Sequence, residues 1–403
     1  MNTPPASQPL RVGAVGLGRA FTLMLPTFQQ DPRVRLVAAA DPIGAARRRF
    51  EKDFSAPTFE SMEALCALPE VQAVYIASPH QLHAEHVRIA AAHGKHVLVE
   101  KPMALALDEC TQMIEFARSA GVHLVVGHSH SFNRPIQRTR EIIASGTYGA
   151  VKMIHAFNYT DFLYRPRRPE ELDTAQGGGV VYSQAAHQID IARLLGGGRV
   201  ASVQAHTGAW DSTRPTEGAY SALLGFEGGA FASATYSGYG HFDSDALMGH
   251  IGEMGQAKTP ADHGASRRRL QSAGSTAEET ALKAARNYGG TNYTAPLAAA
   301  RPNAHQHFGH IVVSCEKADL RPDATSVTVY ADDTITVENL PPPAIPRVEV
   351  IDELVNAVLH GKQPVHSGEW ARATLEVCLA MLASQQQGRR VHLMHQVALP
   401  PGL

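Results

Sequence analysis

The chain has 403 residues, enough for two domains of ordinary size. Hydrophobic residues make up 44% of it and charged residues 18%, which is typical of a water-soluble globular protein. The formal net charge is −2, so the composition argues against a basic surface for nucleic acid, and we expect no nucleic-acid partner.

The cysteines and the first residues indicate the compartment. Cys66, Cys110, Cys315 and Cys378 are widely separated and form no C-x-x-C pair, which argues against a zinc ribbon or a disulfide framework. Residues 1–10 lack the apolar run of a signal peptide, and no stretch is long and apolar enough to span a membrane. We therefore expect a protein of the reducing cytoplasm with no membrane partner, in which residues 1–10 form a flexible arm.

Residues 11–130 alternate short Val-rich runs with helical segments. The expected strands are 11–16, 34–40, 71–78, 96–101 and 123–128. One of the intervening helices is expected to have Asp108 as its N-cap and to run to Ala120, with Gly121 as its C-cap signal. This alternation predicts a parallel sheet covered by helices on both faces.

Beyond residue 130 the pattern changes to longer, consecutive strands. The expected strands are 151–160, 200–210, 219–226, 229–239, 325–330 and 333–338. One helix near 180–195 interrupts them, and consecutive strands with few helices predict a largely antiparallel sheet in an α+β domain over 131–345. Residues 253–305 are polar and weakly periodic, so we expect an insertion there, over the active site or at a subunit contact. Residues 346–403 are expected to form C-terminal helices.

A glycine-rich turn follows the first expected strand. Gly16 and Gly18 open the next helix, and Asp41 ends the second strand, where an acid binds the ribose of a dinucleotide. The third position of this fingerprint is Phe21 rather than Gly or Ala, which puts the usual close helix–strand contact in doubt and leaves an ordinary βαβ turn as the alternative. Asp41 would repel a 2′-phosphate and favours NAD, although Arg47–Arg49 leave NADP open.

The 21 histidines raise the question of a metal. His83 and His86 lie three apart on an expected helix, the spacing of a ligand pair. No cysteine or close carboxylate set completes a tetrahedron, so we expect no metal site.

Several stretches together resemble the glucose–fructose oxidoreductase, inositol dehydrogenase and rhizopine-catabolism (Gfo/Idh/MocA) family. They are VGAVGLGRA, AAADP, AVYIASPHQLHAEHV, AAHGKHVLVEKPMAL, GGGVVYSQAAHQID and EWARATLEVCLAMLASQQQGRRV. The resemblance implies an α/β protein with an NAD-binding Rossmann domain over 11–130 and a C-terminal α+β domain with a large, open, mostly antiparallel sheet. It also implies a homodimer or homotetramer that uses this sheet.

The resemblance also implies functional residues. Glu100 would hold the nicotinamide ribose, Lys101 would face the substrate hydroxyl, and His187 would be the catalytic histidine of the second domain. The position four before His187 is Ser183, where the resembling family commonly has Asp. A spacing of four places both residues on one face of a helix, so the carboxylate beside the histidine is missing in this chain. The cofactor-binding residues implied in this way are Gly16, Gly18, Arg19, Ala20, Asp41, Ser78, Pro79, His83, Glu100 and Lys101.

Lys101 suits proton transfer for physical reasons. It follows a buried strand, and strands of a doubly wound sheet end at the ligand crevice. Burial and a positively charged nicotinamide would both lower the pKa of the lysine, so that it could take a hydroxyl proton. A Glu100–Lys101 surface pair and a structural His187 are the alternatives, and the principal base, Lys101 or His187, stays open.

Two further stretches, RPRRPEELDTAQGGGVVYSQAAHQIDIARLLGGG and YSGYGHFDSD, resemble the phthalate cis-4,5-dihydrodiol dehydrogenase branch. The implied reaction is oxidation of an aromatic-derived dicarboxylate diol to 4,5-dihydroxyphthalate. Two carboxylates call for cations, although a solvated basic loop is the alternative reading of the arginines. The expected substrate-binding residues are His130, Arg134, Arg165, Arg168, Ser183, Gln184 and His187. A sugar or inositol dehydrogenase, an NAD-assisted glycosidase and a regulator without turnover are the competing functions.

Overall fold

The computed structural model describes residues 8–127, 129–294 and 302–400. Most of the expected N-terminal arm and part of the expected insertion, residues 295–301, lie outside these ranges. The chain forms two compact units. The first draws on Met1–Gly127, Ala284–Ala300 and Ile345–Gly368, and the second on His128–Lys283, Arg301–Ala344 and Glu369–Leu403.

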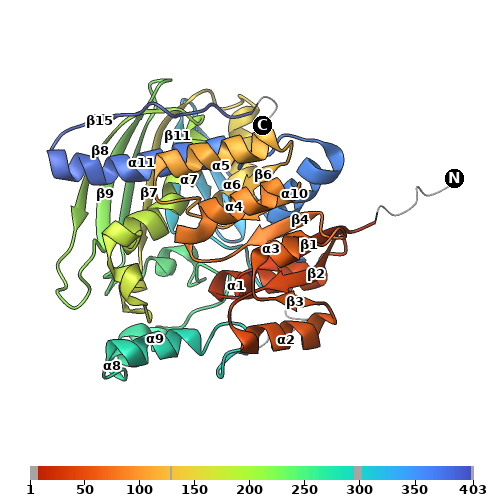
Figure 1. Ribbon diagram of the computed structural model, residues 1–403. Helices are drawn as coiled ribbons and strands as arrows, with labels where there is room; N and C mark the ends of the chain where they lie inside the picture. Colours follow the sequence, from red (N-terminus) through yellow and green to blue (C-terminus); the bar gives the residue numbers. More distant parts are fainter. Residues whose placement is uncertain (1–7, 128, 295–301, 401–403) are drawn as a thin grey trace. The chain divides into compact units, whose positions relative to one another are not determined.

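The first unit is built on a six-stranded sheet of order β3-β2-β1-β4-β5-β6 (Figure 1). All neighbouring strands are parallel, which confirms the prediction of a parallel sheet. The strand order is that of a dinucleotide-binding Rossmann fold. The strands are β1 Leu10–Val15, β2 Val34–Ala40, β3 Thr58–Phe59, β4 Ala73–Ile76, β5 His96–Val99 and β6 Leu124–Val126. Every residue of β4 is fully buried, as expected for a strand covered on both faces.

Six α-helices lie among the described residues of this unit. They are α1 Arg19–Gln30, α2 Gly44–Phe54, α3 Met62–Cys66, α4 His83–Ala92, α5 Leu107–Ser119 and α10 Val348–His360. The predicted N-cap of α5 at Asp108 is wrong: Ala106 is the N-cap, because the Glu109 carboxylate accepts the N–H groups of Leu105 and Ala106 at 3.0 and 3.1 Å.

The helix α10 lies far along the chain from the other helices of the first unit. The Thr27 hydroxyl donates to the carbonyl of Pro346 at 2.5 Å, and Arg33 forms an ion pair with Asp352 at 2.6 Å. Residues 346–403, grouped together in the sequence interpretation, are thus divided between the two compact units, with α11 (Gly368–Gln387) falling almost entirely in the second.

The second unit is built on a nine-stranded sheet of order β14-β13-β12-β11-β7-β10-β9-β8-β15. Only β7 and β10 pair in parallel, so the prediction of a mostly antiparallel sheet is confirmed. Sequence interpretation missed the β11–β12 hairpin. The strands are β7 Val151–Tyr159, β8 Val200–Gly208, β9 Ala219–Phe226, β10 Phe231–Ser237, β11 His310–Cys315, β12 Ala318–Pro322, β13 Ser326–Ala331, β14 Ile335–Asn339 and β15 Val391–His392.

The insertion is partly helical. The other helices of the second part of the chain are α6 Arg134–Ala144, α7 Ala186–Gly196, α8 Ala265–Gln271 and α9 Thr276–Ala284. The insertion thus contains α8 and α9, and the segment after Lys283 joins the first unit.

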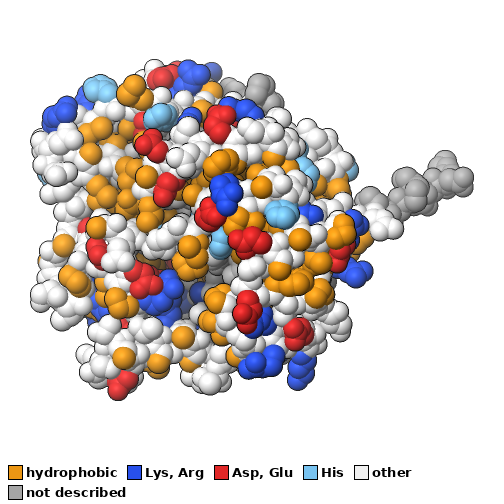
Figure 2. All heavy atoms as spheres, viewed as in Figure 1, with side chains coloured by type: hydrophobic (Ala, Val, Ile, Leu, Met, Phe, Trp, Pro, Cys, Tyr) orange, Lys and Arg blue, Asp and Glu red, His pale blue; other side chains and the backbone are white. Residues whose placement is uncertain are grey.

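The surface charges and the hydrophobicity of the helices bear on the kind of partner that the protein can have. On the face shown in Figure 2, acidic and basic side chains are interspersed, in keeping with the small net charge. Among the helices in the described ranges, none has the length and hydrophobicity needed to cross a membrane.

A buried polar network joins α7 to α11 in the second unit. Asp190 accepts the indole N–H of Trp370 at 2.6 Å and the Thr374 hydroxyl at 2.8 Å. The fully buried Arg193 donates to the Thr374 hydroxyl at 2.7 Å and lies 3.9 Å from the centre of the Trp370 ring. Burial lowers the pKa of Arg193 to about 10, although nearby Asp190 opposes this shift. The network fixes the helix that carries His187.

We expect Asp190→Ala to destabilise the protein by about 3 kcal/mol, because it leaves several buried donors without their acceptor. Asp352→Ala is the matched control, since it removes an exposed carboxylate, 46% accessible, and should cost less than about 1 kcal/mol. Urea denaturation followed by tryptophan fluorescence measures both. Equal unfolding midpoints for the two variants would contradict the role given to this network.

Candidate functional site

Strand register brings three loops of the first unit to one edge of its sheet. Val15 pairs with Ile76, and Ile76 pairs with Val99, so the residues that follow these strands lie next to one another. Gly16 has φ +86°, and a Cβ atom there would lie 2.8 Å from the backbone of Ala77. Only glycine suits this position, which leaves the backbone open to close approach by a ligand.

The glycine turn leads directly into α1 and is held by Asp41. Gly18 is the N-cap of α1, and Arg19 and Ala20 are its first residues. The two carboxylate oxygens of Asp41 accept the N–H groups of Leu17 at 2.6 Å and Ile43 at 2.7 Å. A backbone cradle at a helix N-terminus, with a buried acid at the end of β2, fits the pyrophosphate and ribose of a dinucleotide.

The structure explains the unusual Phe21. The ring is fully buried and packs against Phe50, with centroids 6.2 Å apart, and edge-on against Tyr288 at 5.1 Å. Tyr288 belongs to the expected insertion, and its hydroxyl donates to Asp53 at 2.8 Å. An aromatic layer completed by the insertion therefore occupies the place where a third glycine would allow close packing.

The loops after β4 and β5 are tied together by His83. One ring nitrogen lies 3.1 Å from the carbonyl oxygen of Ser78 and the other 3.0 Å from that of Pro102. Burial lowers the pKa of His83 to about 4, and its hydrogen bonds to these carbonyls oppose that shift. The Ser78 hydroxyl pairs with His86 at 2.9 Å, and Pro79 precedes a 3-10 turn over His80–Leu82. The structure thus gives His83 a role in holding the cofactor-side loops.

Glu100 and Lys101 lie at the end of β5. The Glu100 carboxylate is buried and accepts the hydroxyl of Tyr75 at 2.6 Å. Burial and this carboxylate both raise the pKa of Tyr75. Lys101 is partly exposed, and its peptide bond to Pro102 is cis. Glu100 and Lys101 therefore lie at the same edge of the sheet as Gly16.

In the second unit, His187 lies on α7 just after an irregular turn. Residues Val181–Ala185 form a π-helical turn, a feature frequent at functional sites. The expectation that Ser183 and His187 share one face assumed a regular α-helix, and the wider turn alters that spacing. The Ser183 hydroxyl donates to the carbonyl of Gly179. His187 is buried and packs against Phe308, with ring centroids 5.0 Å apart.

Gln184 contributes to a polar group beside this turn. Its side-chain oxygen accepts the hydroxyl of Tyr236 at 3.2 Å, and the Tyr236 hydroxyl also pairs with Thr160 at 2.8 Å. Burial raises the pKa of Tyr236, so its hydroxyl keeps its proton and can act as a donor.

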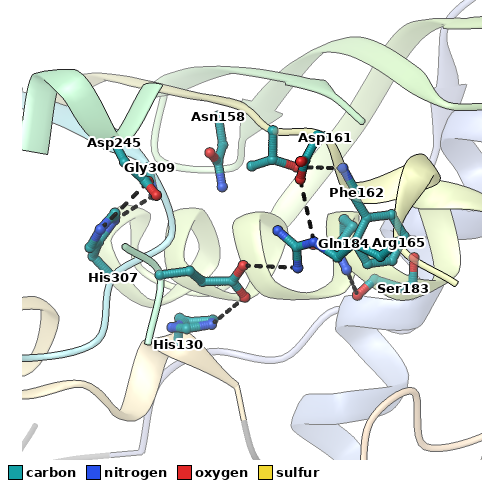
Figure 3. Close-up of polar contacts among 12 residues, drawn as sticks. His130, Asn158, Asp161, Phe162, Arg165, Ser183, Gln184, Asp245, His307 and Gly309 are labelled. Atoms are coloured by element: carbon teal, nitrogen blue, oxygen red, sulfur yellow. Dashed lines mark hydrogen bonds and ion pairs between the residues drawn. The ribbon is translucent and has the colours of Figure 1, made fainter. Parts of the chain in front are cut away.

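Glu253 contacts two predicted residues, His130 and Arg165, both of which are labelled in Figure 3. One carboxylate oxygen lies 3.3 Å from Nε2 of His130 and the other 3.9 Å from Nη1 of Arg165. Asp161 also faces Arg165, at 3.6 Å. Burial would raise the pKa of Glu253, but His130 and Arg165 lower it to about 2. Sequence interpretation missed Glu253, because it lies in the weakly periodic insertion with no motif around it.

The other predicted cations have different surroundings. Arg134 lies on α6, is 41% exposed and pairs with Glu141. Arg168 pairs with Glu170 at 3.0 Å and with Glu171 at 3.5 Å. Arg165, in contrast, is linked through Glu253 to His130, whose ring packs against His187. Among the described residues, no group of three or more His, Cys, Asp or Glu side chains is arranged to hold a metal ion.

Comparison with known proteins agrees with this architecture. Residues 10–128 match the oxidoreductase family with an NAD-binding Rossmann fold, and residues 136–257 match the GFO/IDH/MocA C-terminal domain. The NAD prediction is thereby confirmed at the level of the family's cofactor-binding domain.

Two individual relatives cover nearly the whole chain, and a third covers about half of it. A 1-carboxy-3-chloro-3,4-dihydroxycyclohexa-1,5-diene dehydrogenase of Comamonas testosteroni is 50% identical over 93% of this chain and 94% of its own length. A crystal structure of a dehydrogenase from Bordetella bronchiseptica RB50 is 42% identical, covers 96% of this chain and 100% of that one, and has a TM-score of 0.89. A myo-inositol 2-dehydrogenase of Thermotoga maritima is 29% identical over 48% of this chain and 57% of its own length.

Asp41→Asn should relax the preference for NAD over NADP. Asparagine keeps an oxygen that can accept one loop N–H, but it removes the negative charge that repels a 2′-phosphate. We expect the ratio of kcat/KM for NADP to that for NAD to rise about tenfold. Steady-state kinetics with both cofactors measure this ratio, with the exposed Glu85→Gln as a charge-matched control. An unchanged ratio would mean that other groups select the cofactor.

Proposed function

We propose, from the premise that the chain belongs to the Gfo/Idh/MocA family of oxidoreductases, that it oxidises a ring-carboxylated cyclohexadiene cis-diol to the corresponding catechol with NAD. The observation that carries this proposal is the 50% identity with the Comamonas dehydrogenase, whose name specifies a carboxylated dihydroxycyclohexadiene. A relationship of that depth over 93% of the chain favours a diol of the same class.

The proposed reaction removes a proton and a hydride from one carbinol group of the ring. The hydroxyl proton leaves to a base, the hydride leaves the same carbon, and a ring ketone remains, which enolises to the catechol. Bound NAD supplies the hydride acceptor. Lys101 is the proposed base, because its amine, once deprotonated, can take the hydroxyl proton. His187 is proposed to orient the hydroxyl or to share its proton.

Arg165 is the proposed anchor of a ring carboxylate. Its two acidic neighbours lie 3.6 and 3.9 Å away, beyond ordinary hydrogen-bond distance, so its guanidinium can still form a short bidentate pair with a ligand carboxylate. His130 and Gln184 are proposed to bind the diol or the second carboxylate. His83 is proposed to support the loops that hold the cofactor.

The number of carboxylates on the substrate is the finer part of the proposal. The phthalate cis-4,5-dihydrodiol, with two carboxylates, follows from the resemblance of residues 165–198 and 236–245. The name of the Comamonas relative specifies one carboxyl group and a chlorine. We propose the phthalate diol as first candidate and a singly carboxylated diol as second, acted on by a cytoplasmic homodimer or homotetramer.

A substrate panel tests the function directly. Purified protein with NAD is given the phthalate diol, the chlorinated monocarboxylate diol, a benzene cis-dihydrodiol without carboxylates, and myo-inositol. Absorbance of reduced cofactor should rise with the carboxylated diols. Turnover of inositol alone would instead favour a polyol dehydrogenase, which the partial similarity to the Thermotoga enzyme makes the natural rival.

We expect Lys101→Ala to lower kcat by about a thousandfold, because general-base catalysis contributes on the order of 10²- to 10⁴-fold. The dissociation constant of NAD, measured by fluorescence titration, should change less than about threefold, since backbone groups and Asp41 hold the rest of the cofactor. Lys95→Ala is unsuitable as a control because that lysine is buried; the exposed Lys152→Ala serves instead. Full turnover by Lys101→Ala would transfer the base to His187.

Arg165→Ala should raise KM for a carboxylated diol about tenfold or more and leave kcat within about threefold, because it removes binding shared by ground and transition states. The benzene diol, which carries no carboxylate, should show no such change. The control is Arg199→Ala, which removes an arginine that is 53% exposed and pairs with Glu227. Equal KM values for the two arginine variants would show that Arg165 does not anchor a carboxylate.

A further inference from the structure

Position 183, which precedes His187 by four residues, is a serine in this chain and offers no carboxylate to that histidine. The structure turns the Ser183 hydroxyl toward the carbonyl of Gly179, one turn back along the chain. A serine engaged in this way supplies no negative charge to His187. The charge has to come from another part of the fold if the histidine is to be assisted.

Glu253 brings a carboxylate to this region from the insertion. It lies 123 residues from His130 in the sequence, yet one of its oxygens is 3.3 Å from Nε2 of that ring. The Glu253 side chain is 23% exposed and the His130 side chain only 2%, so solvent screens the contact weakly. The carbonyl of Glu253 also accepts the N–H of His307 at 3.2 Å, which fixes the segment locally.

Asn133 determines which nitrogen of His130 carries the proton. The Asn133 side-chain nitrogen donates to the carbonyl of Gln306 at 2.9 Å and lies 2.8 Å from Nδ1 of His130. Because an amide nitrogen only donates, Nδ1 is the acceptor. Neutral His130 therefore carries its proton on Nε2 and donates it to Glu253.

His130 in turn packs on the proposed catalytic histidine. The two rings meet nearly edge to face, with centroids 4.7 Å apart and an angle of 71° between planes. Phe308 borders both, at 5.2 Å from the His130 ring and 5.0 Å from the His187 ring. An apolar wall of this kind lowers the local dielectric and strengthens the effect of a nearby charge.

We propose that Glu253 is a positioning residue that supplies, through His130, the negative charge that position 183 lacks. This role presupposes the proposed oxidation. Glu253 holds His130 in one tautomer and orientation, and its charge favours the positive charge that develops on His187 as that ring shares the hydroxyl proton. Outer partners of this kind, which orient a functional histidine, typically change activity by about 10- to 100-fold when removed.

Glu253 has a second, opposite effect that makes the proposal easy to test. Its other oxygen faces Arg165 at 3.9 Å, so its charge competes with a substrate carboxylate for that cation. A carboxylate oxygen of Asp161 lies 3.6 Å from Nε of Arg165, so this residue also places a negative charge beside the guanidinium. Removing either acid should tighten binding of a carboxylated diol, but only Glu253 contacts His130 among the described residues of this pair.

Glu253→Gln and Asp161→Asn therefore form a matched pair. Gln keeps an oxygen that accepts the His130 proton but removes the charge. We expect it to lower kcat about tenfold and KM for the carboxylated diol about threefold. Asp161→Asn should lower KM by a similar factor and retain kcat. Glu278→Gln, at an exposed helix start, controls for loss of a negative charge in the insertion. Thermal melting checks that each variant folds.

The kinetic outcomes separate this inference from the proposed function. The comparison uses whichever alcohol of the panel the wild-type enzyme oxidises, so turnover of inositol alone would remove the diol assignment while the kcat comparison still decides the role of Glu253. Equal kcat values for Glu253→Gln and Asp161→Asn would overturn the positioning role. Failure of the wild type to oxidise any alcohol would remove the proposed function and this role together.

Discussion

The parallel register of β1, β4 and β5 is the constraint on which the cofactor side of the protein depends. Parallel strands in register end at the same edge, so a glycine turn, a serine–proline loop and a Glu–Lys pair arrive together from three distant parts of the sequence. The backbone of Ala77 passes so close to Gly16 that no side chain fits there. Close approach of protein backbones thus creates the same open cradle that a pyrophosphate needs.

The substrate side depends on a different constraint, which is that buried charges require partners. Asp190, Arg193 and Trp370 satisfy one another between α7 and α11, so the helix bearing His187 has a fixed base. A π-helical turn, Val181–Ala185, leads into this helix. In the same unit, His130 and Arg165 share Glu253. Charge pairing therefore orders both the support and the reactive side chains.

Local sequence patterns predicted much of the fold. Alternating Val-rich runs predicted the parallel sheet, and the glycine turn with Asp41 predicted the cofactor cradle, because these features depend on residues close together in the sequence. Contacts between distant segments could not be predicted in this way. Glu253 meets His130 across 123 residues, and Tyr288 completes the packing of Phe21 from within the insertion. The β11–β12 strands were missed because His310–Cys315 follows a segment without clear periodicity.

Arginine geometry shows how folding selects among residues that look alike in the sequence. Arg134 and Arg168 have carboxylates of their own at short range, whereas the acids near Arg165 stand 3.6 and 3.9 Å away. A guanidinium pairs most strongly when two N–H groups meet two carboxylate oxygens at hydrogen-bond distance. The loose acids around Arg165 offset its charge without filling that geometry. A cation held in this manner is partly neutralised in the folded protein. Its guanidinium can still form a bidentate pair with a planar ring carboxylate, which is the recognition that the proposed substrate requires.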